Sequence, residues 1–309
     1  MRTDKDSSGR AARIRVPAST SNLGAAFDAV GLALQLHLTL EVCLLDQGVS
    51  RIEFTGQDAH LVPSDESNLI WRTMAEVAAT RGIQLPPFLL RVENRIPITK
   101  GLGSSASAIL AGAAAASFLC RLNLTPEELL EIAAAREGHP DNVAPALYGG
   151  LVASMSGDRI LCSRSRFPSD WTVVAVTPDF ELETKRARAV LPAQVPYHDA
   201  VYNVQRAAFL MAQLVQGRKE GLREAMADAL HQPYRSELLP GLNEVLAMEP
   251  SEGLLGVALS GAGSTVVAFA DSHGSEIGAR IRSIFARHGL SSQVRLLKAD
   301  NEGLVVEEL

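Results

Sequence analysis

Residues 97–107 read PITKGLGSSAS, a glycine loop that leads directly into an alanine-rich segment, Ala106 to Cys120. Alanine is the best helix former, and Ser104 and Ser105 can cap the first free amides, so a helix is predicted here. Glycines let the backbone approach a phosphate closely, and the helix dipole favours negative charge at this end. The stretch therefore predicts an anion site, with two serine hydroxyls available for phosphate or Mg²⁺.

Two other interpretations of the glycine loop fit less well. The P-loop pattern GxxxxGK[ST] occurs nowhere in the chain. Residues 101–106 do match the GxGxxA pattern of dinucleotide-binding folds, but Pro97 separates the loop from the preceding strand, and a second helix follows the first. NAD binding is therefore a distant alternative. An isolated GxG would favour a plain turn, and here the serine pair and the adjoining helix reverse that preference.

Strands and helices alternate on both sides of the loop. Before it, β-rich runs predict strands at 33–45, 52–54 and 88–92, with a helix at 67–81. After it, a helix starts at Thr125-Pro126 and runs to about Glu137. The second half predicts a strand at 171–177, helices at 201–216 and 221–230, and a hairpin around SGAGS within 254–270.

The segment 157–170 is polar, basic and broken by proline, so we place a domain boundary there. We expect a flexible arm at 1–12, an N-terminal domain at 13–165 and a C-terminal domain at 166–309.

Composition narrows the class of protein. The 309 residues are 47% apolar and 21% charged, as in ordinary globular proteins, and the net charge of −6 offers no electrostatic footprint for nucleic acid. The longest apolar stretches are too short or too broken by glycine to cross a bilayer. Three cysteines without CxxC spacing predict neither a disulfide framework nor a zinc cluster. We expect a cytoplasmic protein that binds neither membrane nor nucleic acid.

The segment PITKGLGSSASA resembles the phosphate loop of the GHMP kinase family of small-molecule kinases. Residues 16–34, VPASTSNLGAAFDAVGLAL, and 256–269, GVALSGAGSTVVAF, lie where that family has its other motifs. The first of these, together with EGHPDNVAPALYGG at 137–150, resembles the family members that phosphorylate homoserine. The chain departs from them at 20–26, where TSNLGAA replaces the commoner SANLGPG.

The resemblance implies an α+β, two-domain GHMP kinase fold. The N-terminal, ATP-binding domain would be like domain 2 of ribosomal protein S5, the C-terminal domain ferredoxin-like, and the site would lie in the cleft between them. It also implies ATP and Mg²⁺ as cofactors and a homodimer. The implied reaction is phosphorylation of the hydroxyl of L-homoserine to O-phospho-L-homoserine and ADP, in threonine biosynthesis.

The resemblance also assigns substrate-site residues by motif position: Asn22, Asp28, His139, Asp141, Asn142, Thr184, Arg188 and Arg235. We expect Asp28 to pair with the ammonium, and Arg188 and Arg235 to hold the carboxylate with their two-pronged guanidinium groups. Asn22 or His139 would orient the hydroxyl. Each residue taken alone also has a plain structural interpretation: HPDN is a good interhelical turn, and arginines are usually solvated surface charges.

The catalytic assignments implied by the resemblance are Asp141, Asn142 and Glu137. Asp141 is the candidate base, although the matching acid of related kinases aligns alternatively with Asn142. Ser105 and Glu137 resemble the Mg²⁺ ligands, with Glu131 as the second choice of acid. The expected ATP-binding residues are Asn68, Pro97, Lys100, Gly101, Leu102, Gly103, Ser104, Ser105, Ala106 and Ser107.

Three of these nucleotide-side expectations have competing interpretations. Asn68 also suits the cap of the helix that follows it, and Lys100 suits a solvated turn. Gly261 and Gly263 are expected to form a tight turn behind the phosphate loop, and a plain hairpin turn is the competing interpretation.

Two alternative functions remain at this point. The first is another GHMP kinase, of the mevalonate or shikimate type, which the two arginines and Asp28 disfavour because they suit a zwitterionic substrate. The second is a non-catalytic, ligand-binding GHMP regulator. This alternative is disfavoured because GLGSS, Glu137 and Asp141 are intact.

Overall fold

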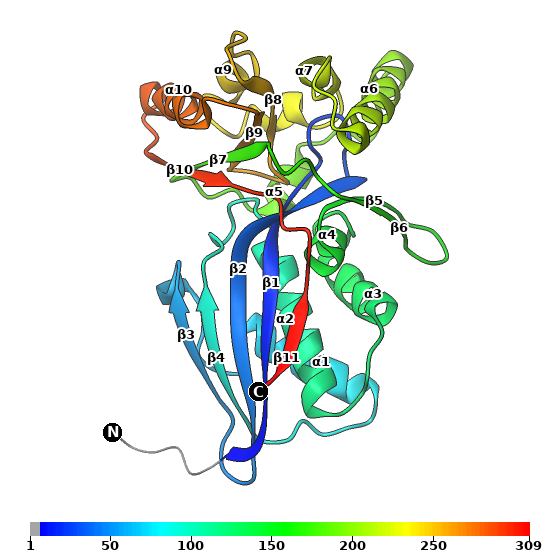
Figure 1. Ribbon diagram of the computed structural model, residues 1–309, viewed down its shortest axis with the longest axis vertical. Helices are drawn as coiled ribbons and strands as arrows, with labels where there is room; N and C mark the ends of the chain where they lie inside the picture. The colour runs from blue at the N-terminus through cyan, green and yellow to red at the C-terminus, as the bar shows by residue number, and fades with distance from the viewer. Residues whose placement is uncertain (1–6) are drawn as a thin grey trace.

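The computed structural model describes residues 7–309, which form two sheets with helices packed on them (Figure 1). The first sheet has seven strands in the order β11-β1-β2-β4-β3, with β5 and β6 continuing from β2. Its strands are β1 (Ser7–Ser21), β2 (Val30–Leu45), β3 (Arg51–Gly56), β4 (Phe88–Asn94), β5 (Leu151–Met155), β6 (Leu161–Ser165) and β11 (Val305–Glu308). All pairs are antiparallel except β3 with β4.

The helices of the first half pack against this sheet around the buried, alanine-rich α2 (Figure 1). They are α1 (Leu69–Thr80), α2 (Ser104–Leu119), α3 (Pro126–Glu137) and α4 (Val143–Tyr148), with a short 3₁₀ turn, η1 (Ala59–Leu61). Small side chains let α2 approach its neighbours closely: a Cβ at Gly112 would lie 2.7 Å from the Ile70 carbonyl oxygen of α1. Thr125 and Glu128 form a capping box at the start of α3, where the sequence predicts a helix start.

The second sheet has four antiparallel strands in the order β10-β7-β9-β8. They are β7 (Thr172–Pro178), β8 (Leu254–Leu259), β9 (Val266–Ala270) and β10 (Ser292–Leu297). Numbered within the domain, the order is 4-1-3-2, which confirms the ferredoxin-like expectation. Around it lie α5 (Thr184–Ala189), α6 (Tyr197–Gln216), α7 (Leu222–Ala225), α8 (Gln232–Arg235), α9 (Leu242–Leu246) and α10 (Gly274–Arg287).

Two expectations about the ends of the domains are wrong. Residues 7–12 are not part of an arm, because Ala11 and Ala12 pair with β2 in the first sheet; residues 1–6 lie outside the described residues. The C-terminal domain does not extend to residue 309, because Val305 to Glu308 return to the first sheet and pair with β1. The chain passes from the first sheet to the second between Ser165, where β6 ends, and Thr172, where β7 begins.

The helix predicted at 221–230 is also wrong over most of its length. Only Leu222–Ala225 are helical, and a turn then leads to α8 (Gln232–Arg235). The Asp228 side chain accepts the amide of Leu230, and Pro233 starts a new helix, so the chain turns here. This turn lies next to the site described below.

Candidate active site

A cavity of about 420 Å³ lies between the two sheets and is lined from both halves of the chain. The glycine loop forms its middle, with Lys100, Gly101, Gly103, Ser104 and Ser105 on the wall. One end is charged and the other apolar. The charged end contains Asp28, Glu137, His139, Asp141, Arg188 and Arg235; the apolar end contains Leu38, Phe54, Leu61, Val62, Pro63, Leu69, Ile70 and Ile98.

The glycine loop ends where α2 begins, so the unpaired amides of the first turn of α2 lie at the cavity wall. Gly103 is the N-cap residue and has a left-handed backbone with φ 69°. A Cβ there would lie 2.1 Å from Ser19 Oγ, so only glycine fits. Ser107, one turn into the helix, donates to the Pro17 carbonyl at 2.8 Å. The loop is thus held rigidly against β1, as a preformed anion site requires.

The turn between β8 and β9 supports the loop from behind, as expected. Ser260 Oγ donates to the Gly101 carbonyl at 2.6 Å, and the Thr265 amide donates to the Lys100 carbonyl at 3.0 Å. A Cβ at Gly101 would lie 2.3 Å from the Ser260 carbonyl oxygen. The second domain therefore sets the position of a loop that belongs to the first.

Five of the expected ATP-binding residues do not line the cavity. Pro97, Leu102, Ala106 and Ser107 are buried behind its wall. Asn68 caps α1, because its Oδ1 accepts the Ile70 amide at 2.9 Å, and its Nδ2 donates to the Pro63 carbonyl at 2.8 Å. The structure therefore gives Asn68 the capping role, and through Pro63 it fixes the loop that forms the apolar end.

The apolar end was missed by sequence reasoning. Its residues come from β2, β3, η1, α1 and the segment after β4, so they are scattered over 38–98. No local pattern marks them, since each is an ordinary apolar residue of a strand or loop. A slot lined by aliphatic and aromatic side chains beside an anion site suits a flat heterocycle such as adenine.

At the charged end, Asp28 and Arg188 are paired with each other. Arg188 donates through Nη2 to Asp28 Oδ1 at 2.8 Å and through Nη1 to Oδ2 at 3.0 Å. This hydrogen bonding to Asp28 raises the pKa of Arg188. The two side chains are 35% and 37% exposed, so a ligand can reach both. The pair presents one negative and one positive group side by side.

Arg235 is buried, not a solvated surface charge. Its Nε donates to the Ala187 carbonyl at 3.2 Å, and its Nη1 donates to the Gly261 carbonyl at 3.0 Å. Burial, followed by repulsion from Arg188, lowers the pKa of Arg235 to about 10, so it remains a cation at neutral pH. The Phe27 ring, which sequence reasoning also missed, lies 5.2 Å from the Arg235 guanidinium and 5.8 Å from that of Arg188.

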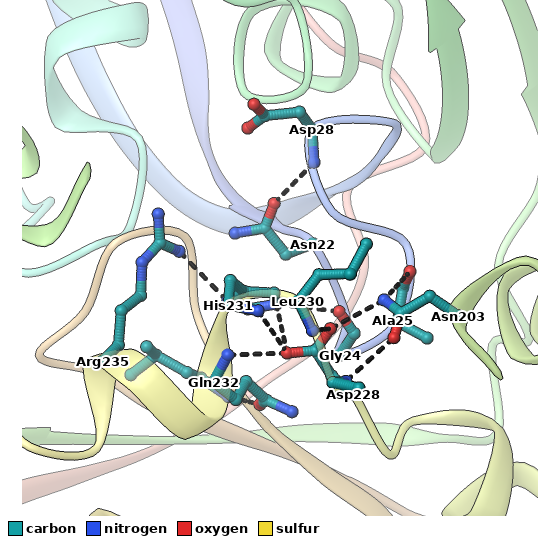
Figure 2. Close-up of polar contacts among 12 residues, drawn as sticks. Asn22, Gly24, Ala25, Asp28, Asn203, Asp228, Leu230, His231, Gln232 and Arg235 are labelled. Atoms are coloured by element: carbon teal, nitrogen blue, oxygen red, sulfur yellow. Dashed lines mark hydrogen bonds and ion pairs between the residues drawn. The ribbon is translucent and has the colours of Figure 1, made fainter. Parts of the chain in front are cut away.

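Asn22 holds the loop that presents Asp28 (Figure 2). Its backbone is left-handed, with φ 73°, a conformation that asparagine tolerates better than most residues. Its Oδ1 accepts the Asp28 amide at 3.0 Å, and its Nδ2 donates to the Gly261 carbonyl at 2.9 Å. Asn22 lies on the cavity wall, but these bonds give it the task of positioning Asp28.

His139 and Asp141 form a hydrogen-bonded pair beside Asp28, through His139 Nδ1 and the Asp141 carboxylate. Burial disfavours both charges, yet the bond and the mutual attraction outweigh it, so the pKa of His139 is raised and that of Asp141 is lowered. Ligand atoms of Asp28, His139 and Asp141 lie within 4.8 Å of one another. Thr184, at the start of α5, also lines this end.

Asn142 is tied to β1 on both sides of its amide. Ser19 Oγ donates to its Oδ1 at 3.0 Å, and its Nδ2 donates to Ser21 Oγ at 2.9 Å. The side chain is therefore used to fix the turn that carries Asp141. This arrangement favours Asp141 over Asn142 as the residue that acts on a ligand.

Of the two acids considered for Mg²⁺, Glu137 lines the cavity, whereas Glu131 is exposed outside it. Glu137 ends α3, and Ser105 lies at the start of α2 on the same cavity wall. Within residues 7–309, neither the Ser105 hydroxyl nor the Glu137 carboxylate has a hydrogen-bonding partner in the protein. Two unpaired oxygen donors beside an anion site fit a hard cation such as Mg²⁺.

Among the residues that the structure describes, no helix combines the length and the apolar character needed to cross a membrane.

Comparisons with known proteins show which family the chain resembles. The family model for the N-terminal domain of GHMP kinases matches residues 68–150, and the model for their C-terminal domain matches 210–287. A homoserine kinase from Solibacter usitatus is 43% identical over 282 residues, which cover 91% of this chain and 92% of that protein. One from Desulfitobacterium hafniense is 39% identical over 296 residues, covering 95% and 99%.

A solved structure is similar over almost the whole chain. The homoserine kinase from Cytophaga hutchinsonii superposes with a TM-score of 0.85 at 28% identity, and the match covers 99% of both chains. Near-complete coverage at this similarity includes the strands of both sheets. The chain belongs to the GHMP kinase family, among its homoserine kinases.

Proposed function

We propose that this protein transfers the γ-phosphoryl group of ATP to the hydroxyl of L-homoserine, giving O-phospho-L-homoserine and ADP, as a step of threonine biosynthesis. The observation that carries the proposal is that one cavity holds the glycine loop together with an apolar end and the Asp28–Arg188 pair. A nucleotide and a small zwitterion can then meet at the loop. The homoserine kinases described above support the choice of substrate.

The nucleotide would take the apolar end and the loop. Its base would lie among residues such as Phe54, Leu61 and Val62, and its phosphates would accept hydrogen bonds from the first amides of α2. Ser104 and Lys100 add a hydroxyl and a cation beside those phosphates. We propose that Ser105 and Glu137 hold Mg²⁺, which when bound would neutralise the phosphate charge that develops during transfer.

The substrate would replace the Asp28–Arg188 pair with two pairs of its own. Its ammonium would bind Asp28, and its carboxylate would bind Arg188 and face Arg235. A substrate that has a carboxylate but no ammonium, such as mevalonate or shikimate, would draw Arg188 away and leave Asp28 without a partner. Charge pairing therefore favours a zwitterion over these alternatives.

In the transfer, the homoserine hydroxyl oxygen forms a bond to the γ-phosphorus as the bond to ADP breaks, and the hydroxyl proton leaves. We propose Asp141 as the proton acceptor, held in place by His139. The transition state of phosphoryl transfer is loose, so positioning and charge neutralisation contribute more than basicity. A weak base such as a carboxylate of lowered pKa is then sufficient.

The test is an ADP-release assay on purified protein with ATP and Mg²⁺, in parallel with L-homoserine, mevalonate, shikimate and L-threonine. Homoserine should give the largest kcat/KM by at least tenfold. A larger kcat/KM for mevalonate or shikimate would overturn the substrate assignment, and no ADP release with any of them would favour a non-catalytic regulator. We also propose that the protein is cytoplasmic and that it forms a homodimer. Light scattering on the purified protein measures the number of subunits.

A further inference from the structure

Behind the Asp28 loop lies a buried polar network of the second domain, of which only Arg235 has a role in the assignments above (Figure 2). Its members are Asn203 on α6, Asp228 in the turn before α8, and His231 and Arg235 at the two ends of α8. The side chains of Asp228 and His231 are 0% exposed, and Asn203 is 3% exposed. Burying polar groups this completely is costly unless each is paired, so their partners indicate what they hold.

Asp228 fixes the start of α8. Its Oδ1 accepts the Leu230 amide at 3.0 Å, and its Oδ2 accepts the amides of His231 at 2.9 Å and Gln232 at 2.6 Å. One carboxylate thus accepts the amides of three consecutive residues, which fixes the backbone of the turn that enters α8. The direction of α8, and hence of the side chains of His231 and Arg235, depends on this residue.

Asn203 links this turn to the substrate loop of the first domain. Its Nδ2 donates to Asp228 Oδ1 at 2.7 Å and to the Ala25 carbonyl at 3.1 Å, and its Oδ1 accepts the Ala229 amide at 2.9 Å. All of its polar atoms are thus used between two segments that carry substrate-site residues. Gly24, next to Ala25, touches the same turn so closely that a Cβ there would lie 1.9 Å from the Met226 carbonyl oxygen.

His231 contacts both halves of the substrate site. Its Nε2 donates to the Gly24 carbonyl at 2.9 Å, its ring stacks on Phe27 at 4.9 Å between centroids, and its Nδ1 accepts from Arg235 Nη1 at 3.2 Å. These partners require a neutral ring with its proton on Nε2, since a proton on Nδ1 would face the guanidinium. Burial, which lowers the pKa of His231, favours the same form.

We propose that Asp228 and His231 are positioning residues that set the distance between the ammonium-binding Asp28 and the carboxylate-binding Arg235. His231 touches the loop of the first and the guanidinium of the second, and Asp228 orients His231. The inference rests on the proposed function, because it assigns the homoserine head group to these two residues. It predicts that the network affects homoserine and leaves ATP, at the other end of the cavity, unaffected.

Two substitutions of His231 separate its contacts. His231→Gln keeps an amide nitrogen at the Nε2 position for Gly24 but loses the acceptor for Arg235. His231→Asn keeps an acceptor near Nδ1 but loses the Gly24 bond and the stacking on Phe27. Each should lower kcat/KM for homoserine about tenfold or more, the usual consequence of losing a hydrogen bond to a charged group or displacing a binding loop. KM for ATP should stay within twofold of the wild type.

Gln232→Met is the matched control. Gln232 is the next residue of α8 and is 3% exposed, and its Oε1 accepts the Leu259 amide at 2.8 Å on the side of β8. The substitution removes one buried hydrogen bond from the same helix, and among the described residues the Gln232 side chain has no hydrogen bond to the Asp28 loop or to Arg235. It should lower Tm about as much as the His231 variants and leave kcat/KM for homoserine, per folded protein, within twofold.

Kinetics with both substrates and thermal unfolding are measured on all variants. The proposal is overturned if a folded His231 variant keeps homoserine kcat/KM within twofold of the wild type, or if Gln232→Met lowers it equally. If neither His231 variant folds, Asp228→Asn decides, because it keeps the side chain's shape; it should lower homoserine kcat/KM at least threefold, and an unchanged value refutes the network. A wild type inactive on homoserine instead refutes the proposed function.

Discussion

Replacing Arg188 with leucine separates stability from substrate recognition, because the Asp28–Arg188 pair contributes to the two very differently. With the two side chains 35% and 37% exposed, solvent screens the pair, so its contribution to folding is about 0–1 kcal/mol. Tm should therefore change little. The bound substrate is different, because the homoserine carboxylate would lose a charge-assisted hydrogen bond worth about 1.5–3 kcal/mol.

That loss corresponds to a fall of about ten- to hundredfold in kcat/KM for homoserine. It is increased by Asp28, which would then face the substrate carboxylate without Arg188 to neutralise it. KM for ATP should stay close to the wild-type value, because Arg188 lies at the charged end of the cavity and the apolar end is formed by other elements.

Arg186→Leu is the control for this prediction. Arg186 lies on the same short helix, α5, and its substitution removes the same charge from an exposed position outside the cavity. Steady-state kinetics with homoserine and with ATP, together with thermal unfolding, would be measured for both variants. A change of less than threefold in homoserine kcat/KM for Arg188→Leu, or an equal fall for Arg186→Leu, would refute the role given to Arg188.

Three further predictions follow from the same geometry. Glu137→Gln should raise the Mg²⁺ concentration needed for half-maximal activity, since one anionic ligand is lost, whereas Glu131→Gln should not. Activity is measured against Mg²⁺ concentration for both variants, and an effect of Glu131→Gln alone would make Glu131 the Mg²⁺ ligand. Leu61→Ala should raise KM for ATP severalfold and leave KM for homoserine unchanged, because Leu61 lines the apolar end yet is 54% exposed and contributes little to folding; an equal rise in both would contradict it. The free energy of unfolding should decrease as pH falls from about 6.5 towards 5, because the unfolded chain protonates His231 at its ordinary pKa of 6.5 while burial lowers the native value. Urea unfolding between pH 6.5 and 5 should show this dependence of the free energy of unfolding on pH in the wild type and a smaller one in His231→Gln, whereas equal dependences would assign the effect to another group. His139 and Asp141 do not contribute in this range: His139, with its raised pKa, loses stabilisation only above pH 6.5, and Asp141, with its lowered pKa, only near and below pH 3.8.

The parts of the fold that could be predicted are those set by local signals. Gly103, the alanines of α2 and the Thr125–Glu128 capping box act within a few residues of chain, so their elements form as expected. The return of β11 to the first sheet could not be predicted, because pairing between Ile14 and Val306 depends on how the whole chain folds. The spacing of residues 221–230 predicts one helix, but the helix ends at Ala225, and the Asp228 side chain accepts amides of the turn that follows.

The site divides in the same way. The phosphate loop and the HPDN turn are continuous in sequence, and the structure brings both to the cavity. The residues of the apolar end come from separate elements, so no sequence motif predicts them. By composition alone Arg235 would be a surface charge, and only the family resemblance assigned it to the site. The structure places it in the cavity lining, held by buried contacts with Ala187, Gly261 and His231.

The measurement that tests the account most directly is a competition in one vessel. Purified protein with ATP and Mg²⁺ is given equal concentrations of L-homoserine, mevalonate and shikimate, and the phosphorylated products are identified by mass spectrometry. The account predicts O-phospho-L-homoserine as the predominant product, because only homoserine supplies both an ammonium for Asp28 and a carboxylate for Arg188. Predominant phosphomevalonate or shikimate phosphate would contradict it.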